Sequence, residues 1–463
     1  MFLKEIYLDR RTRLKEKIRK GIILILGNSE SPMNYKSNQY PFRQDSSFLY
    51  FFGVDTPDLA GIIDIDEGTD TIYGDDPDLE DIIWSGYQEE LKVKCGKSGI
   101  KSTKPMAELK ADLGKALAGN RRIHYLAPYR EDRKIYLSFL LNAGYNEIES
   151  GTSVELTEAI IDQRSCKQNE EVAEMEKTMN EVTAVFYLEA MRQTKAGKFE
   201  YEIAGLMKGI ALEKNCRMAY PVICSINGHI LHNPFYGNKM QNGQLLLIDA
   251  GAESPLHYAT DITRTFPVSG KFTTIQKDIY NLVLKAETEA IDSIAPDIKY
   301  LDIHLKAAGI ICQGLKDLGF MKGNVDDAVA SGAHALFFPH GLGHMLGLDV
   351  HDMENLGEDF VGYNGEVKRS SIFGTAYLRL ARKLMPGFTL TVEPGIYFIP
   401  ALISKWQSEG RFSEYINYEK VLQQLDFGGI RIEDNVVVND SGHRIIGPGI
   451  PKTVTDIENI MNG

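Results

Sequence analysis

Four acidic residues lie at or within apolar, strand-like runs in the second half of the chain. They are Asp249 in LLLIDAG, Asp261 in YATDITRTFPV, Glu393 in FTLTVEPG and Glu433 in GGIRIEDNVVV. Acidic side chains are unfavourable in strand interiors and are almost never fully buried without partners. Any fold built on these strands must therefore supply the four carboxylates with compensating charge.

A histidine-rich segment offers further ligands. FFPHGLGHMLGLDVHD, residues 337 to 352, holds His340, His344 and His351, three of the ten histidines in the chain. The spacing HGLGH is that of the helical zinc-protease pair, but no glutamate follows the first histidine, and each glycine costs a helix interior about 1 kcal/mol. We therefore expect a turn or extended segment whose histidines find partners elsewhere in the chain.

A shared cation is the economical way to satisfy these groups. A single carboxylate at a strand end often caps a turn, but that explanation would have to hold four times independently. Along GIRIE, side-chain alternation places Arg431 on the same face as Glu433. The set is oxygen-rich and has no thiolate, which favours ions such as manganese over a structural zinc. Four negative charges exceed what one ion needs, so we expect two divalent ions roughly 3.5 to 4 Å apart.

The composition argues against nucleic acid as a partner and for a reducing compartment. The chain has 51 basic and 64 acidic residues, a formal charge of -13, and no long Lys/Arg run, so nucleic acid is a poor candidate partner. Five cysteines without a CxxC predict free thiols in a reducing compartment. The charged start of the chain and the lack of any long apolar window predict a cytoplasmic protein without membrane contact.

The chain is predicted to form two domains. Up to about residue 160, strand-like runs (GIILILG, SSFLYFFGV, LAGIIDIDEG, TDTIYG, RRIHYLA) and a helical stretch near 105–118 predict a small α/β domain. A long helical pattern then runs from about Glu170 to Thr194. Further helices are expected near 199–215, 274–293 and 301–317, followed or separated by the runs that carry the four acidic residues.

These motifs together carry a family resemblance. LIDAG, DITRTFPVSGKF, PHGLGHMLGLDVHD, TVEPGIYF and GIRIEDNVVV, in this order, resemble the proline-specific metallopeptidases of the pita-bread fold. The group comprises Xaa-Pro aminopeptidase (aminopeptidase P) and Xaa-Pro dipeptidase (prolidase). YPFRQDSSFLYFFGV is similar to the amino-terminal domain of the aminopeptidase P group. The resemblance implies an α+β protein, with a creatinase-like α/β domain at 1–160 and a pita-bread catalytic domain at 161–463.

The resemblance also implies a role for each site residue. Asp249 and Asp261 would hold one manganese ion, and Asp261, His344, Glu393 and Glu433 would hold the other, with Glu393 also accepting a proton from the bridging water. His340 and His351 would act as catalytic donors that either support the metal ligands or contact the substrate. The substrate-binding residues would be His232, Tyr397 and Arg431. Trp84 resembles a tryptophan that in some relatives reaches a neighbouring subunit's site, although plain core packing explains it equally well.

The implied chemistry suits the substrate. An Xaa-Pro bond is a tertiary amide without an N–H, so a peptidase that reads the scissile N–H cannot grip it. Two metal ions would lower the pKa of a bridging water to about 7, and the resulting hydroxide would attack the carbonyl carbon. Glu393 would pass the proton to the leaving nitrogen, and His340 or His351 would stabilise the oxyanion.

Several alternatives stay open at this point. The segment between Glu393 and Glu433 contains a long insertion that resembles prolidases, whereas FRQDSSFLYFFGV and DITRTFPVSGKF resemble aminopeptidase P. We prefer an aminopeptidase acting on peptides with proline in second position and keep the dipeptidase as the alternative. A metal-free binding scaffold is disfavoured because all five ligand positions are present. A related hydrolase of phosphorus esters would use the same centre. Relatives suggest a homodimer or homotetramer.

Overall fold

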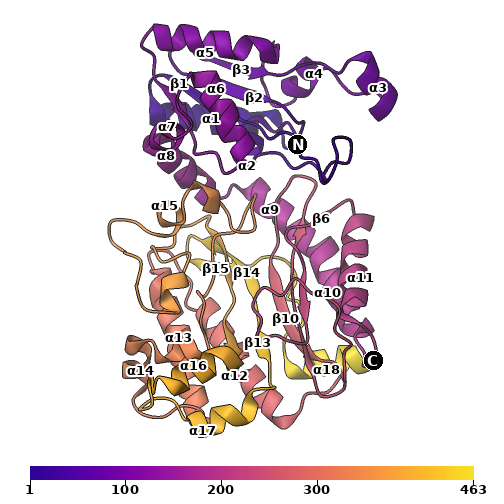
Figure 1. The fold of residues 1–463 in the computed structure, drawn as a ribbon, viewed down its shortest axis with the longest axis vertical. Helices are drawn as coiled ribbons and strands as arrows, with labels where there is room; N and C mark the ends of the chain where they lie inside the picture. Colours follow the sequence, from indigo (N-terminus) through magenta and orange to yellow (C-terminus); the bar gives the residue numbers. More distant parts are fainter. The chain divides into compact units, whose positions relative to one another are not determined.

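The computed structural model describes residues 1–463, which divide into two compact units, Met1–Arg164 and Ser165–Gly463 (Figure 1). Each unit contains both helices and sheets, in agreement with the expected α+β class. None of its helices combines the length and the apolar character needed to cross a bilayer. The five cysteines form no disulfide, as predicted.

The first unit is built on one five-stranded mixed sheet of order β4-β3-β2-β1-β5. Its strands are β1 (Ile22–Leu26), β2 (Ala60–Asp64), β3 (Thr69–Tyr73), β4 (Ser102–Lys104) and β5 (Ile123–Tyr125). Its helices are α1 (Lys4–Ile18), α2 (Ser46–Phe52), α3 (Leu79–Ser85), α4 (Leu91–Gly96), α5 (Leu109–Ala118), α6 (Glu131–Leu141), α7 (Glu147–Ser150) and α8 (Val154–Ser165). Apolar side chains of β1, β2, α5 and α6 pack together into a buried core.

The prediction of a strand at SSFLYFFGV is wrong, because this run forms helix α2. Every residue of α2 is buried, so the run shows neither the helical nor the strand period. The end signals decide instead. Asp45 caps the helix by accepting a hydrogen bond from the Phe48 N–H, and Gly53 ends it in the left-handed conformation at φ 66°.

The second unit holds four small antiparallel sheets, ordered β10-β8-β7, β11-β14-β15, β12-β13 and β6-β9. Its strands are β6 (Arg217–Met218), β7 (Ile223–Ser225), β8 (Leu245–Ala250), β9 (Ala252–Glu253), β10 (Ile262–Pro267), β11 (Thr389–Val392), β12 (Gly395–Tyr397), β13 (Gly429–Arg431), β14 (Asp434–Asn439) and β15 (Gly442–Ile445). The predicted strand runs around Asp249, Asp261 and Glu393 are confirmed. Glu433 lies between β13 and β14 rather than inside one strand.

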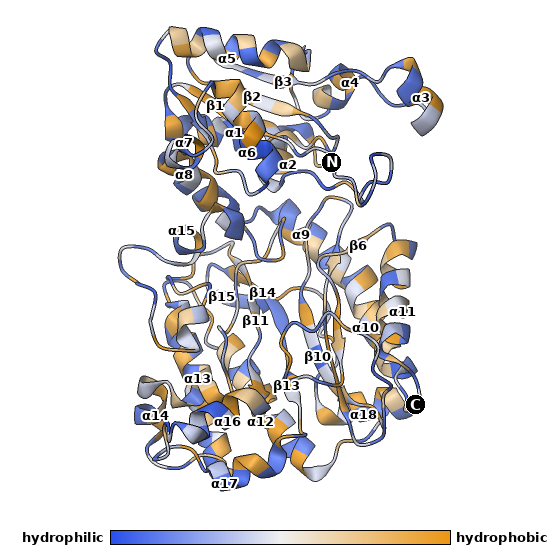
Figure 2. Cartoon of the chain, viewed as in Figure 1, coloured by the Kyte–Doolittle hydropathy of each residue, from blue (hydrophilic) through white to orange (hydrophobic).

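The helices of this unit carry both hydrophobic and hydrophilic residues, so that each can bury one side (Figure 2). They are α9 (Asn169–Thr178), α10 (Ala184–Gln193), α11 (Glu200–Glu213), α12 (Thr274–Ile291), α13 (Tyr300–Asp317), α14 (Val325–Ser331), α15 (Glu358–Gly362), α16 (Pro400–Ser408), α17 (Tyr418–Val421) and α18 (Val454–Asn462). The helices predicted near 199–215, 274–293 and 301–317 are confirmed. The long pattern from Glu170 to Thr194 is also helical, with a π-helical turn at Met179–Thr183 between α9 and α10.

Two of the sheets are joined at the strand ends that carry acidic residues. The Glu433 N–H donates to the carbonyl of Thr263 on β10 at 3.1 Å. Within the first sheet Thr263 lies opposite Asp249, and within the second Val392, the residue before Glu393, lies opposite Asp434. Strand pairing therefore brings the four acidic residues to one place, although they are far apart in the sequence.

Candidate metal centre

A cavity of about 730 Å³ lies among the strand ends of the second unit. Nine of the ten predicted site residues line it: His232, Asp249, Asp261, His340, His344, His351, Glu393, Arg431 and Glu433. The tenth, Tyr397, is fully buried and is not among the lining residues. The remaining wall is largely apolar and includes Leu231, Phe373 and Leu402.

Asp249 and Asp261 are brought together by a close approach of the backbone. Asp249 lies on β8, and Asp261 directly precedes β10, its neighbour in the sheet. Between them, Gly251 passes so close to the chain that a Cβ there would lie 1.7 Å from the Thr260 carbonyl oxygen. Only glycine fits this position, which explains the glycine of LIDAG.

A residue that the sequence did not single out connects the two aspartates. The Tyr220 hydroxyl lies within hydrogen-bonding distance of the Oδ1 atoms of both Asp249 and Asp261. A phenol carries one proton, so it cannot satisfy two carboxylates fully. Burial, followed by the charges of the two aspartates, raises the pKa of Tyr220 well above its usual value. A cation bound between Asp249 and Asp261 would stabilise the two carboxylates.

The HGLGH segment is not helical, as predicted, and its glycines allow two close approaches. A Cβ on Gly343 would lie 2.1 Å from the carbonyl oxygen of Thr391 on β11, and one on Gly341 would lie 2.7 Å from the Leu378 Cα. The segment runs beside β11, where the His344 N–H donates to the Thr391 hydroxyl at 3.1 Å. The ring nitrogen Nδ1 of His344 lies 2.9 Å from the Met345 carbonyl, which leaves Nε2 directed at the acidic residues.

Glu393 and Glu433 complete the acidic set. The Glu393 N–H donates to the Leu342 carbonyl at 2.8 Å, so this residue is held beside the HGLGH segment. Glu433 accepts a hydrogen bond from the Thr263 hydroxyl through Oε2 at 2.7 Å. Its second oxygen, Oε1, is buried without a hydrogen-bond partner. A buried carboxylate oxygen without a donor is costly, and a cation would remove that cost.

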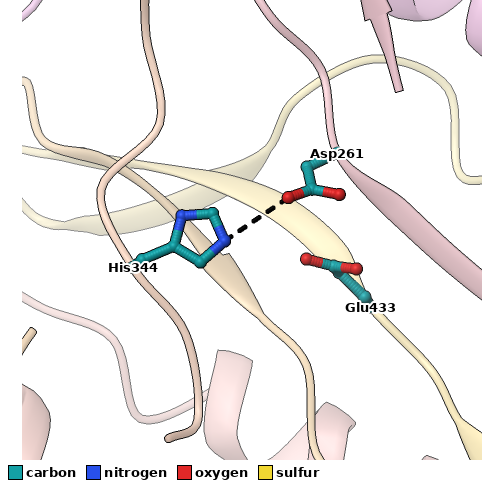
Figure 3. A group of neighbouring side chains, drawn as sticks. All are labelled: Asp261, His344 and Glu433. Atoms are coloured by element: carbon teal, nitrogen blue, oxygen red, sulfur yellow. Dashed lines mark ion pairs between the residues drawn. The ribbon is translucent and has the colours of Figure 1, made fainter. Parts of the chain in front are cut away.

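Asp261, His344 and Glu433 form the tightest group (Figure 3). One ligand atom of each lies within 4.8 Å of the others, and all three residues are buried. The Nε2 atom of His344 lies 3.4 Å from Asp261 Oδ2 and 3.6 Å from Glu393 Oε1. This is a donor set of carboxylate oxygens and one imidazole, which is the chemistry expected for a catalytic divalent ion.

Electrostatics point the same way. Burial is the main cause that raises the pKa values of Asp261, Glu393 and Glu433 well above their ordinary values, and the neighbouring carboxylates raise them further. Burial also lowers the pKa of His344 to about 4, so its ring is neutral and can act as a ligand near pH 7. These groups lack counter-charge in the protein alone. Divalent cations would supply it, so the residues fit a metal site.

A chain of hydrogen bonds holds Arg431, Tyr397 and His340. Arg431 Nη1 donates to the Tyr397 hydroxyl at 2.8 Å, and that hydroxyl lies 2.9 Å from His340 Nε2. His340 Nδ1 lies 2.8 Å from the Gly341 carbonyl. Because a neutral imidazole has one N–H, His340 donates to the carbonyl and accepts from Tyr397. In this arrangement His340 has no N–H left for a substrate.

The other two predicted histidines lie differently. His351 Nδ1 is 2.6 Å from Glu354 Oε2, and its ring packs against that of His344 with centroids 4.2 Å apart. No protein group contacts its Nε2 by a hydrogen bond, so that atom is available to a ligand. His232 is exposed at the cavity wall. Trp84 on α3 is 80% exposed, which contradicts the core-packing explanation of this residue.

Two residues of the site were missed by sequence reasoning. Tyr220 stands in MAYPVICS, where nothing in the local pattern sets it apart. Arg379 lines the cavity and pairs with Glu354, the partner of His351. The only sequence signal for Arg379 was that a basic residue stands shortly before FTLTVEPG. That signal does not single it out, because LRLARK contains three basic residues.

Comparison with known proteins gives matches over nearly the whole chain. Residues 173–440 match metallopeptidase family M24, and residues 7–125 match the amino-terminal domain of aminopeptidase P. The chain is 32% identical over 471 residues to the Xaa-Pro dipeptidase of Homo sapiens, covering 98% of this chain and 92% of that one. It is 30% identical over 469 residues to the Xaa-Pro aminopeptidase of Escherichia coli, covering 98% and 96%.

Solved structures give the same result. The structure of aminopeptidase P from Escherichia coli with the inhibitor Pro-Leu matches with a TM-score of 0.82 at 29% identity, covering all of this chain and 98% of the other. Another structure of that protein is zinc-substituted and in complex with product.

Proposed function

The chain belongs to metallopeptidase family M24, and on that premise we propose that it is a metal-dependent peptidase that cleaves the bond between an amino-terminal residue and a following proline. Membership confirms the family resemblance and the pita-bread fold expected from the sequence. The observation that carries the proposal is the convergence of Asp261, His344 and Glu433 on one point of a substrate-sized cavity.

We propose two metal ions in this cavity. Asp249 and Asp261 would hold one, and Asp261, His344, Glu393 and Glu433 would hold the other. Four carboxylates line the cavity, and of its two arginines Arg431 pairs with Asp249 while Arg379 pairs with Glu354. This excess of negative charge supports two divalent ions rather than one. When bound, the ions supply an activated water and offset the carboxylate charge. Manganese is the metal that we propose, because the donors are mainly oxygen.

Glu393 is the residue that we propose to move the proton. It stands next to His344 and has no basic partner closer than this imidazole. The nitrogen of an Xaa-Pro bond carries no hydrogen, so it must gain one before proline can leave. A carboxylate that takes a proton from the attacking water and returns it to this nitrogen serves both steps.

His351, rather than His340, is the better candidate to stabilise the oxyanion. Its Nδ1 is held by Glu354, and its Nε2 is free for the substrate. Burial lowers the pKa of His351 to about 4, so the free site holds a neutral ring. Donation from Nε2 requires protonation, which the developing negative charge would favour and Glu354 would support. His340 would keep Tyr397 and Arg431 in place.

The size of the cavity supports an aminopeptidase. A volume of about 730 Å³ is more than a dipeptide needs and leaves room for residues beyond the proline. The test compares Ala-Pro, Ala-Pro-Ala and Ala-Ala-Ala as substrates for the manganese-loaded protein. We expect cleavage of Ala-Pro-Ala at the proline, no cleavage of Ala-Ala-Ala, and loss of activity with EDTA. A loaded protein that cleaves neither proline peptide would refute the proposal.

A dipeptidase is the second candidate, and one observation favours it. The guanidinium of Arg379 lies in the cavity wall, where it could bind the free carboxylate of a dipeptide. Its pairing with Glu354 and its distance of 3.9 Å from Glu358 reduce the charge that it offers. Cleavage of Ala-Pro without cleavage of Ala-Pro-Ala would favour the dipeptidase. The cytoplasmic location and the homo-oligomeric state expected from the sequence remain predictions.

A further inference from the structure

Glu200 is a fully buried acidic residue outside the metal centre. It is the first residue of α11, and no lysine, arginine or histidine pairs with it. A buried carboxylate without a cation is costly unless hydrogen bonds and dipoles replace its hydration. The groups that donate hydrogen bonds to the Glu200 carboxylate are therefore needed to keep it buried.

Those groups come from two points of the chain. Glu200 Oε1 accepts a hydrogen bond from the Ile226 N–H at 2.8 Å. On the other side, the Asn238 N–H donates to Oε2 at 3.2 Å, and Asn238 Nδ2 lies 3.1 Å from Oε1 and 3.0 Å from Oε2. The amino terminus of α11 adds a favourable dipole at this position. One side chain thus binds residues 226 and 238 at the same time.

Residues 226 and 238 are the two ends of a loop that forms part of the cavity wall. The loop contains no helix or strand, and it carries Leu231, His232, Asn233 and Pro234 into the lining. Its first part also packs on the strand of Arg431, where a Cβ on Gly228 would lie 2.7 Å from the Gly429 carbonyl oxygen. Without regular structure, the position of the loop depends on how its ends are held.

We propose that Glu200 is a positioning residue that closes the 226–238 loop and thereby places His232 against the substrate. The inference deepens the proposed function and rests on it for the role of His232. The charge is essential to this role, because a carboxylate presents acceptors to all the donors at once. An amide in its place would turn an N–H group toward the Ile226 N–H or the Asn238 donors and leave one of them without a partner.

Hydrogen exchange of the loop tests the clamp without any substrate. The variant is Glu200→Gln, and amide exchange is followed by mass spectrometry on peptides that cover 226–238. We expect exchange there to quicken about tenfold, as expected when a buried donor loses its partner, with no change in the sheet peptides. The matched control is Glu171→Gln. Glu171 is also buried in the first turn of a helix, α9, but contacts Tyr258 and Gln168 instead of the loop.

A double-mutant cycle tests whether the clamp acts through His232. We expect Glu200→Gln to lower kcat/KM for Ala-Pro-Ala about tenfold in the wild-type background and less than about twofold in the His232→Ala background. Glu200→Asp keeps the charge and should recover part of the loss. If Glu200→Gln does not fold, Asn238→Ala removes the side-chain donor at the second end of the clamp and leaves its backbone N–H; it is expected to give the same pattern with a smaller loss.

The outcomes separate this proposal from the proposed function. Unchanged exchange in the loop would overturn the clamp, whatever the activity of the variant. Fully additive losses in the cycle would overturn the assignment to His232. A wild-type protein that cleaves no Xaa-Pro peptide would refute the proposed function, while the exchange experiment would still decide whether Glu200 holds the loop.

Discussion

Arg431 Nη2 donates a hydrogen bond to Asp249 Oδ2 at 2.5 Å, which joins β13 to β8 in the wall of the cavity. The same guanidinium donates to Tyr397 and, through Nε, to the Thr263 hydroxyl at 3.1 Å. Arg431 was expected to contact the substrate. In the structure its guanidinium donates three hydrogen bonds to other side chains, and one of these side chains is Asp249, a proposed metal ligand.

Substitution of Arg431 should therefore weaken metal binding as well as catalysis. A lysine cannot reproduce the planar fork of donors, so Arg431→Lys leaves Asp249 or Tyr397 without its partner. We expect kcat/KM for Ala-Pro-Ala to fall about 100-fold, as for a lost charge-assisted hydrogen bond, with a weaker manganese affinity. Calorimetric titration with manganese checks the second part. An unchanged metal affinity with a raised KM would restrict Arg431 to substrate binding.

Glu393→Gln should retain the fold and lose turnover. The amide keeps the size of the side chain but cannot accept a proton, and general acid–base catalysis contributes about 10²- to 10⁴-fold. We expect kcat to fall by that factor while the melting temperature of the metal-free protein is not lowered. Turnover near the wild-type value would remove Glu393 from the mechanism.

Asp261→Asn should show opposite effects with and without metal. In the metal-free protein, burial and the Asp249 charge disfavour the ionised form of Asp261 and raise its pKa. A neutral amide relieves that repulsion, so the variant should melt no lower than the wild type in EDTA. With manganese, the wild type should gain stability and the variant should not, because it lacks the shared ligand. Calorimetric scans in the two buffers provide the check. Equal stabilisation of both proteins by manganese would exclude Asp261 from the site.

The buried pair Lys167 and Asp352 should be needed for stability. Lys167 Nζ lies 2.7 Å from Asp352 Oδ2, and both side chains are almost completely buried. Lys167→Met would remove the ammonium group that faces a buried carboxylate and cost about 3 to 5 kcal/mol in the free energy of unfolding. Adding Asp352→Asn removes the remaining buried charge and should recover most of the loss. Urea denaturation measures both variants, and a double variant as unstable as the single one would contradict this explanation.

Two buried histidines should make the protein sensitive to acid. His304 on α13 and His334 are fully buried with ring centroids 6.3 Å apart, and burial lowers their pKa values to about 3 and about 4. Below the unfolded pKa near 6.5 the unfolded chain binds protons that the folded chain excludes, so stability is lost as the pH falls from about 6.5 toward 4.

The variants His304→Leu and His334→Leu test this pH dependence. Each should reduce the loss of unfolding free energy between pH 7.5 and pH 5 by about 2 kcal/mol, and the double variant should reduce it by about twice that. Urea unfolding at the two pH values gives the comparison. If the wild type and the double variant lose the same unfolding free energy between the two pH values, His304 and His334 are not the cause of the acid sensitivity.

Prediction from sequence succeeded where a short motif contains the residue types that bind a cation. Acidic residues that end apolar strands, and a histidine segment too rich in glycine for a helix, were sufficient to predict a cation site. It failed at SSFLYFFGV, because a fully buried run has no period and the cap at Asp45 went unnoticed. It left His340 and His351 as equal candidates for the oxyanion donor, and the contacts of His340 with Gly341 and Tyr397 are the reason that we propose His351.

The sequence by itself determined which ligand types exist, near which strand-like runs they stand, and that glycine disfavours a helix at HGLGH. These are local properties, set by side-chain chemistry and backbone preference. Only the tertiary structure decided that Glu433 pairs with Thr263, that Tyr220 lies between two aspartates, and that Glu200 holds the loop of His232. Such contacts join residues far apart in the chain, so their geometry depends on how the sheets pack and not on any neighbouring residue.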